Sequence, residues 1–315
     1  MSAFHSETPS ETAAAAWHGL AHLAHWGVIR AQGADAASFL HGQLTQDFVL
    51  LGQHEARLAG YCSAKGRMLA SFIGCKRASD EILLICHRDL LAPTLKRLSM
   101  FVLRAKVKLS DASADYALDG AVGAAVPAEL DAKPWAKTEI GADDWIRLPS
   151  AGVARALRIA PAAIERSDRE MKLELAQWNW LEVRSGVTLV CQALAEEFVP
   201  QMLNYESIGG VNFKKGCYPG QEVVARSQYR GVLKRRAQIF HAESGIAVGQ
   251  PVFHASDAEQ PCGLVAAAAP CPTGGWDAIV SLQTSALDGQ ALTAGSPSGA
   301  ALRILPLPYE LLQDI

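Results

Sequence analysis

The sequence predicts an α+β protein that ends in a small all-β domain, on three observations. The 315 residues exceed what one core usually serves, and a hydrophobic content of 50% is ample for two or three cores. Residues 27–109 mix β-prone runs with stretches of helical periodicity. After Arg236 the chain changes to short β-prone runs punctuated by Gly, Pro, Ser and Asp, which is typical of a small barrel or sandwich over residues 237–315.

The first part of the chain predicts a small sheet with helices on one side. A helix is expected from Asp35, a plausible N-cap, and a second from about Asp89, where Leu91, Leu95 and Leu98 share a face. Strands are expected at 27–30, 57–64, 68–76, 82–87 and 105–109.

The middle of the chain is less regular. Residues 112–142 predict loops and short strands, and strands follow at 145–148 and 154–159. A helix is expected over 167–185, ended by Gly186. Trp178 and Trp180 lie on different faces of that helix, so we expect at least one of them in the core, and only the other is free to stack on a ligand. The barrel strands are expected at 237–240, 250–254, 263–267, 278–282 and 300–305.

Charge and composition indicate a cytoplasmic protein. A net charge of -3 with 19% charged residues gives no global field for nucleic acid or membranes. Residues 1–16 are expected to be a disordered tail without the cations of a leader peptide, and no apolar run is long enough to span a bilayer.

The cysteine pattern is typical of a reducing compartment. The seven cysteines are odd in number and form no C-x-x-C pair, so neither a zinc site nor an iron-sulfur cluster has its usual spacing, and no resident metal is expected. On a helix, His18, His22 and His25 would align as a metal face, but a solvated or packed histidine face is the favoured interpretation.

The segment from Lys214 to Arg226, KKGCYPGQEVVAR, carries the clearest chemistry. Cys217 follows two lysines, and a Pro-Gly pair then predicts a helix start. Nearby cations and the N–H groups of a helix N-terminus favour the charged sulfur over the neutral thiol. The alternative is a small buried hydrophobe, which is the commonest role of a free cysteine.

The segment from Ile208 to Gly231 resembles the signature of the YgfZ family of folate-binding proteins, which is related to the T-protein of the glycine cleavage system. Residues 27–30, 35–47 and 65–70 resemble it too. The resemblance implies a GcvT-like α+β fold, with subdomains in a ring around a central folate pocket over residues 17–236 and a C-terminal β-barrel alongside. It also implies a ferredoxin-like subdomain at about 55–125.

The resemblance also implies the site. Cys217 is its reactive residue, and the expected contacts to tetrahydrofolate are Lys215, Gly216, Tyr218, Gly220, Gln221, Glu222 and Arg226. Gln221 and Glu222 suit the pterin donors. The cations that suit the glutamate tail are Lys214, Lys215, Arg226, Arg230, Lys234, Arg235 and Arg236.

Two features of this segment leave alternatives open. Glu222 and Arg226 are four residues apart on the predicted helix, so they are also placed to pair with each other. In the T-protein relatives a glutamate before an Ala-Gly pair helps hold the pterin, whereas Arg184 stands here before Ser185-Gly186.

The implied function is a folate-binding accessory protein for assembly or repair of iron-sulfur enzymes, including tRNA-modifying ones. Its partners would be folate and those client enzymes, with a tRNA link through the clients and with no membrane or DNA. One alternative is an aminomethyltransferase-like one-carbon transferase, with Asp47 as a loosely placed proton-handling carboxylate. The other is a tRNA-binding module that uses residues 226–236 and the basic stretch 96–108.

Overall fold

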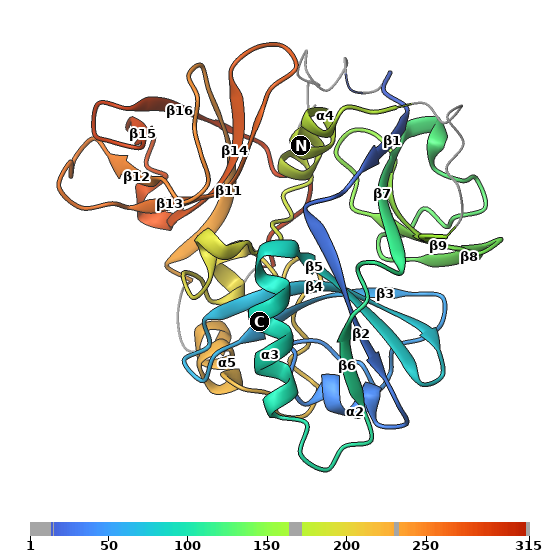
Figure 1. Ribbon diagram of the computed structural model, residues 1–315. Coiled ribbons are helices and arrows are strands. Elements are labelled where there is room, and N and C mark those ends of the chain that lie inside the picture. The colour runs from blue at the N-terminus through green and yellow to red at the C-terminus, as the bar shows by residue number, and fades with distance from the viewer. Residues whose placement is uncertain (1–13, 15, 164–171, 230–232, 313–315) are drawn as a thin grey trace.

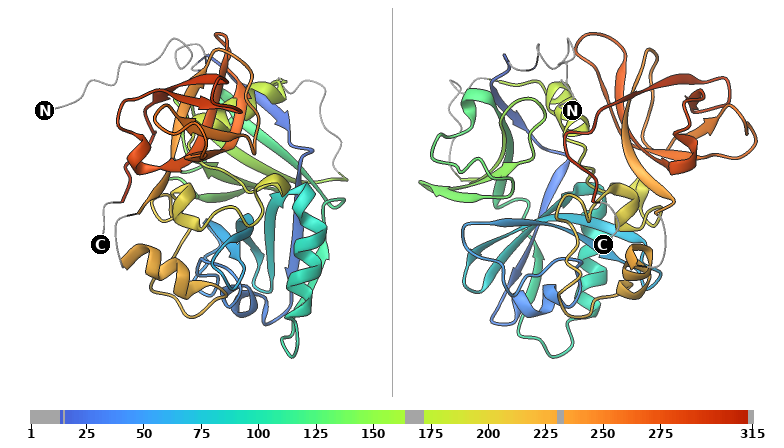
Figure 2. Two further views of the ribbon diagram at one scale, coloured as in Figure 1. Left: turned by 90° about the vertical axis from the view of Figure 1, so that its left-hand side faces the viewer. Right: turned by 180° about the vertical axis from the view of Figure 1, so that it is seen from behind.

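The computed structural model describes residues 14, 16–163, 172–229 and 233–312 and contains three β-sheets. Figure 1 shows the sheets arranged around the middle of the molecule, with the barrel beside α4 and the two open sheets on the other sides. The view from behind in Figure 2 shows the same triangular arrangement. The predicted α+β class and the closed C-terminal β-barrel are confirmed.

The first open sheet has the order β3-β4-β5-β2-β6 and is antiparallel. Its strands are β2 (Trp26–Gln32), β3 (Ala56–Cys62), β4 (Met68–Ala78), β5 (Glu81–His87) and β6 (Lys108–Asp111). Its helices are α2 (Ala36–His41) and α3 (Arg88–Met100). Asp35 stands at the N-cap of α2 but makes no capping bond, since its Oδ2 accepts from Lys106 N at 2.7 Å.

The second open sheet has the order β1-β7-β10-β9-β8. Its strands are β1 (Gly19–His22), β7 (Tyr116–Val122), β8 (Lys137–Ile140), β9 (Asp143–Leu148) and β10 (Arg155–Pro161). The helical alignment of His18, His22 and His25 that a metal face would need is absent, because His22 ends strand β1 and its Nδ1 lies 3.2 Å from Asp119. The predicted ferredoxin-like range of 55–125 mixes the two sheets, since β7 belongs to the second and β2 lies outside the range.

The barrel closes in the order β11-β14-β13-β12-β15-β16. Its strands are β11 (Arg235–Ala242), β12 (Pro251–His254), β13 (Gly263–Pro270), β14 (Trp276–Gln283), β15 (Leu292–Ala294) and β16 (Ala300–Leu305). Short 3-10 turns lie at Gly123–Ala125, Gln192–Leu194, Pro200–Leu203 and Thr284–Ala286.

Helix α4 (Leu175–Arg184) packs against the barrel strands β13 and β14 and against β1. It begins later than predicted, because Glu174 and Gln177 form a capping box and residues 172–174 are not helical. Residues 167–171 of the predicted helix lie outside the described residues, as does the predicted tail 1–16 apart from Ala14 and Ala16. Both tryptophans of α4 are fully buried, which confirms that at least one belongs to the core and leaves neither ring free to stack on a ligand.

Candidate functional site

A cavity of about 680 Å³ opens where the two sheets meet the chain after Tyr205. Its lining comes from three segments that are far apart in the sequence, so no short motif contains it. The lining residues are Gln46, Asp47, Leu50, Gly52 to Arg57, Asp131, Lys133 to Ala136, Gly209 and Asn212. A second cavity of about 650 Å³ shares Lys133, Pro134 and Trp135 with it. The second cavity reaches Ser185 after α4 and Tyr309 near the C-terminus, so the two cavities adjoin at residues 133–135, and we refer to them together as the central cavities.

Asp47 is the buried carboxylate of this cavity. Its Oδ1 accepts from Leu50 N at 2.9 Å and lies 3.0 Å from His41 Nδ1, and its backbone oxygen accepts from Arg57. Burial acts to raise the pKa of Asp47, but the Leu50 N–H, His41 and Arg57 favour the charged form, and the net effect is a lowered pKa. The site therefore holds a carboxylate anion beside the cavity at neutral pH.

Trp135 gives the site an aromatic wall. It lines both cavities and has φ of 69°, a left-handed backbone conformation that is rare for a bulky residue. Two backbone bonds hold it there, Ala56 N to Trp135 O at 2.7 Å and Trp135 N to Arg147 O at 2.8 Å. Such outliers persist where the surroundings over-determine them, often at binding sites.

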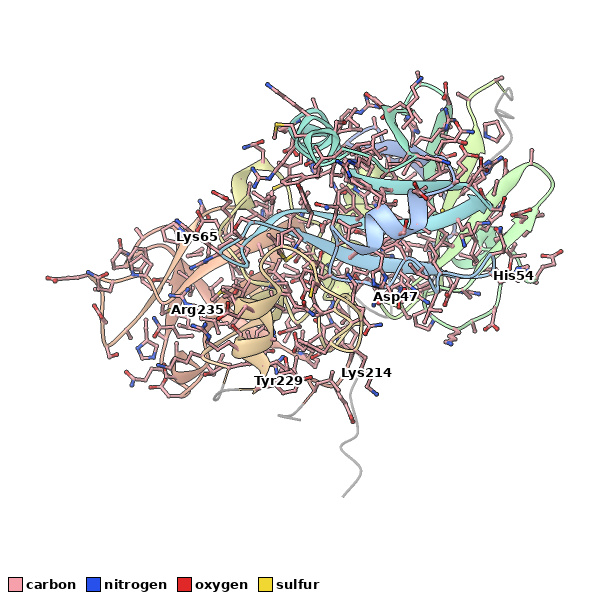
Figure 3. All side chains as sticks on the ribbon, turned by 90° about the horizontal axis from the view of Figure 1, so that it is seen from below. Asp47, His54, Lys65, Lys214, Tyr229 and Arg235 are labelled. Atoms are coloured by element: carbon pink, nitrogen blue, oxygen red, sulfur yellow. The ribbon has the colours of Figure 1, made fainter. Side chains whose placement is uncertain are left out.

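Asn212 joins the cavity to the cysteine loop. It lines the cavity, and its Oδ1 accepts from the backbone N–H groups of Lys214 at 2.9 Å and Lys215 at 3.1 Å. Cys217 follows two residues later and is exposed, so the buried-hydrophobe alternative is wrong. Figure 3 shows Lys214 at the lower rim below Asp47, with Lys65 and Arg235 toward one side and His54 toward the other.

Lys215 anchors the cysteine loop from within. Its ammonium donates to the carbonyl oxygens of His41 and of Leu44, the latter at 2.7 Å, and lies 4.7 Å from the centre of the Tyr218 ring. Burial lowers the pKa of Lys215 to about 8, while the charges of Asp47 and Cys217 act in the opposite direction. Lys215 therefore positions the loop rather than presenting a cation to a folate tail.

Two glycines fix the start of helix α5 (Gln221–Tyr229). Gly220 has φ of +80°, and a Cβ added there would lie 2.4 Å from Ser63 O. Gly66 has φ of +71°, and its Cβ would lie 2.8 Å from Val223 Cβ. The β3–β4 turn and the first turn of α5 are thus in backbone contact, which only glycine permits.

The remaining predicted contacts divide between buried and exposed positions. Tyr218 is buried and Gly216 is exposed, as is Glu222, which pairs with Arg226. Gln221 is half-buried at the first position of α5. Within the described part of the chain, none of the predicted contact residues from Lys215 to Arg226 lines either central cavity.

The predicted cluster of tail-binding cations is also dispersed. Arg236 is buried and pairs with Glu206 while donating to Leu312 O at 2.8 Å. Lys214 is exposed, and Arg230 lies outside the described residues. The cavity instead has Arg57, His54 and Lys133, which sequence reasoning did not single out.

The departure at Arg184 has a structural explanation. Arg184 is buried at the end of α4, with its guanidinium 5.9 Å from the Trp180 ring and Nη1 3.8 Å from Asp277. Glu182 pairs with the buried Arg155. Both side chains hold α4 in place, and Ser185 is the residue of this segment that reaches the cavity.

The comparisons with known proteins agree on a family and a fold. The tRNA-modifying protein YgfZ of Cronobacter sakazakii is 30% identical over 310 residues, 93% of each chain. That of Edwardsiella ictaluri is 29% identical over 94% of this chain and 93% of its own. The crystal structure of the glycine cleavage system aminomethyltransferase T from Bartonella henselae superposes with a TM-score of 0.73 at 16% identity, over 95% of this chain and 88% of that one. No family model matches.

Among the described residues, no helix combines the length and the apolar character that crossing a bilayer requires.

Proposed function

Because this chain belongs to the family of tRNA-modifying protein YgfZ and has the fold of the glycine cleavage T-protein, we propose that it binds a reduced folate in the central cavity and uses Cys217 in the upkeep of iron-sulfur enzymes. The clients would include tRNA-modifying enzymes. The observation that carries the proposal is the central cavity, which joins a buried carboxylate and an aromatic wall to the loop that presents an exposed thiol.

The residues of the cavity suit a tetrahydrofolate. Its volume of about 680 Å³ lies in the range of small-molecule sites. A pterin needs an acceptor for its N–H groups and a flat wall, which Asp47 and Trp135 supply. Of the two carboxylate oxygens of Asp47, Oδ1 accepts the hydrogen bonds described above. Within the described residues Oδ2 has no such partner, so it is available to a ligand. Arg57, His54 and Lys133 suit the carboxylates of the glutamate tail.

The roles of this chain's own residues follow from the geometry. A bound tetrahydrofolate would supply nitrogens that carry a one-carbon unit. Asp47 would hold the pterin through its donors, and Trp135 would exclude water from one face of the ring. Lys215 fixes the loop against the two carbonyls of the α2 segment, so that Cys217 projects to solvent where a client can approach.

The ligand half of the proposal is tested by titrating 5-formyltetrahydrofolate calorimetrically. We expect Asp47→Asn and Trp135→Ala each to weaken binding at least tenfold, the effect of losing one charge-assisted hydrogen bond or one stacking wall. The matched control is Glu222→Gln, which changes an exposed carboxylate outside the cavity and should bind as the parent does. Equal affinity in all four proteins would place the folate elsewhere.

The thiol half is tested in cells that lack the chromosomal gene. We expect Cys217→Ala to lose rescue of an iron-sulfur tRNA-modifying enzyme while its affinity for the folate stays within twofold of the parent. Cys191→Ala, which removes a half-buried thiol, is the control and should rescue fully. Full rescue by Cys217→Ala would remove the thiol from the mechanism, and measured aminomethyl transfer to tetrahydrofolate would instead identify a transferase.

A further inference from the structure

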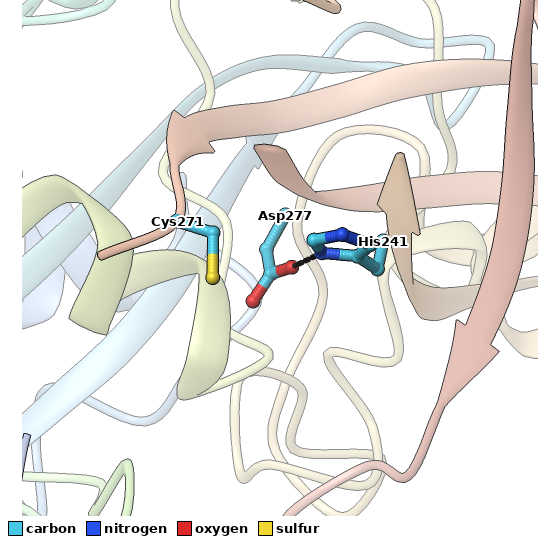
Figure 4. Close-up of side chains that lie close together, drawn as sticks. All are labelled: His241, Cys271 and Asp277. Atoms are coloured by element: carbon cyan, nitrogen blue, oxygen red, sulfur yellow. Dashed lines mark hydrogen bonds and ion pairs between the residues drawn. The ribbon is translucent and has the colours of Figure 1, made fainter. Parts of the chain in front are cut away.

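A second cluster of ligand-forming side chains, none of which lines the two cavities described above, lies where helix α4 packs on the barrel. His241 comes from β11, Asp277 from β14, and Cys271 directly follows β13. Figure 4 shows the Cys271 sulfur and the His241 ring on either side of the Asp277 carboxylate. We propose that these three side chains bind one divalent transition-metal ion, with zinc as the favoured metal.

The geometry requires only small adjustments for a metal. One ligand atom from each residue lies within 4.8 Å of the other two, and His241 Nδ1 lies 2.8 Å from Asp277 Oδ1. A tetrahedral zinc with bonds of about 2.0–2.3 Å would space its ligand atoms about 3.3–3.8 Å apart. The His–Asp pair would therefore open by under about 1 Å and the sulfur would move inward by a similar amount.

The donor set selects the metal. A thiolate, an imidazole and a carboxylate together suit borderline-soft ions such as zinc, whereas magnesium and calcium prefer oxygen ligands alone. Three protein ligands leave a fourth position for water or another ligand. On binding, the Cys271 thiol would release its proton, and the remaining imidazole proton would reside on Nε2.

The neighbours of the three residues are placed as outer partners of a metal site. Glu243 Oε1 lies 3.5 Å from His241 Nε2, on the side where metal-bound histidines commonly have a carboxylate partner. Trp180 Nε1 donates to Asp277 Oδ2 at 2.8 Å, which orients the carboxylate and leaves Oδ1 to the ion. Two metal charges would balance the charges of Cys271 and Asp277, and Arg184 Nη1 lies 3.8 Å from Asp277 Oδ2, on the oxygen that Trp180 also contacts.

The burial of the three side chains suits a site that retains a bound metal ion and still lets the ion enter from solvent. Asp277 is 1% exposed and Cys271 is 7% exposed, so the ligands are shielded from competing water. The His241 side chain is 12% exposed, which gives the ion a path of entry. Without a metal, the pair of His241 and Asp277 is a hydrogen-bonded contact in which Cys271 has no part.

Cobalt(II) titration of the full chain tests the proposal, because cobalt bound by a thiolate gives a charge-transfer band in the near ultraviolet. The exposed Cys217 is first changed to Ala in every protein, so that it cannot supply the sulfur. We expect one cobalt per chain with a thiolate band, displaced by zinc. Cys271→Ser should lose the band and weaken zinc binding at least 100-fold, as measured by competition with a chromogenic chelator.

Cys262→Ala is the matched control, because Cys262 is also a buried barrel cysteine but lies outside the cluster. It should keep the band and the affinity. His241→Gln, which retains a hydrogen-bonding side chain, should weaken zinc binding without removing the band. The proposal is overturned if no stoichiometric cobalt binds, or if the band and the zinc affinity survive in folded Cys271→Ser, and circular dichroism establishes folding in each case.

Discussion

At the scale of single residues, Lys215 is the side chain whose surroundings differ most from the sequence expectation. Sequence reasoning placed a cation near the thiol, and the structure turns that cation inward onto two carbonyl oxygens. The consequence is a buried amine that loses its proton more readily than an exposed lysine does, because burial disfavours its charge.

This burial predicts a rise in stability at high pH. The pKa of Lys215 is lowered from 10.5 to about 8, so between these values the unfolded chain binds a proton that the folded chain does not. Stability then rises as pH rises through this window, by about 3 kcal/mol for a shift of about 2.5 units. Urea unfolding at pH 7 and pH 10 measures the difference between the parent and Lys215→Met. The free energy of unfolding should increase between pH 7 and pH 10 by more in the parent than in Lys215→Met. If the free energies of the two proteins change with pH in parallel, the prediction is contradicted.

At the scale of elements, the contact between the β3–β4 turn and α5 depends on Gly220. We expect Gly220→Ala to destabilise the protein by about 2–3 kcal/mol, since it combines a left-handed backbone with a Cβ 2.4 Å from Ser63 O. Gly209→Ala is the matched control, because Gly209 has φ of +78° with nothing within 4 Å of the added Cβ, and it should cost about 1 kcal/mol. Denaturant unfolding compares the two. If the two variants lose the same free energy of unfolding, the close contact between residue 220 and Ser63 O does not contribute to stability.

Elements also show where sequence reasoning works and where it does not. The strands of the first sheet were predictable because turn residues bound them, as at Lys65-Gly66 and Ser79-Asp80. Strand β7 was not, because residues 118–122 are buried on both faces and the alternation of a half-buried strand is missing. Strand β15 was not predicted, because its three residues are too few to show the alternating pattern of a strand.

The same limit applies to the site. The residues around Cys217 drew attention by their own chemistry, whereas the segment that contains Asp47 was singled out by its family resemblance and Asp47 itself only by loose position. Their partner Trp135 lies in a stretch whose periodicity is weak, and its role follows only from tertiary contacts with Ala56 and Arg147. Pairings between distant segments, such as Lys215 with His41, are likewise a property of the fold rather than of any local pattern.

At the scale of the whole molecule, the seam between α4 and the barrel joins the two parts of the chain. Trp180 crosses it, since its ring is fully buried and its Nε1 donates to Asp277 of β14. Trp178 is equally buried on the other side of the helix, against Trp26, and among the described residues its Nε1 makes no hydrogen bond. The two tryptophans thus offer a matched pair for measuring how strongly the barrel is coupled to the rest.

We expect Trp180→Phe to cost about 1–3 kcal/mol more than Trp178→Phe, because only the first leaves a buried carboxylate oxygen without its donor. The lost hydrogen bond joins α4 to the barrel, so its removal weakens the contact between them and the barrel should unfold separately from the two open sheets. Differential scanning calorimetry should then resolve two transitions in Trp180→Phe and fewer in Trp178→Phe, since weak coupling breaks two-state behaviour. If both variants melt alike, the packing of the rings and not the Trp180–Asp277 bond holds the barrel in place.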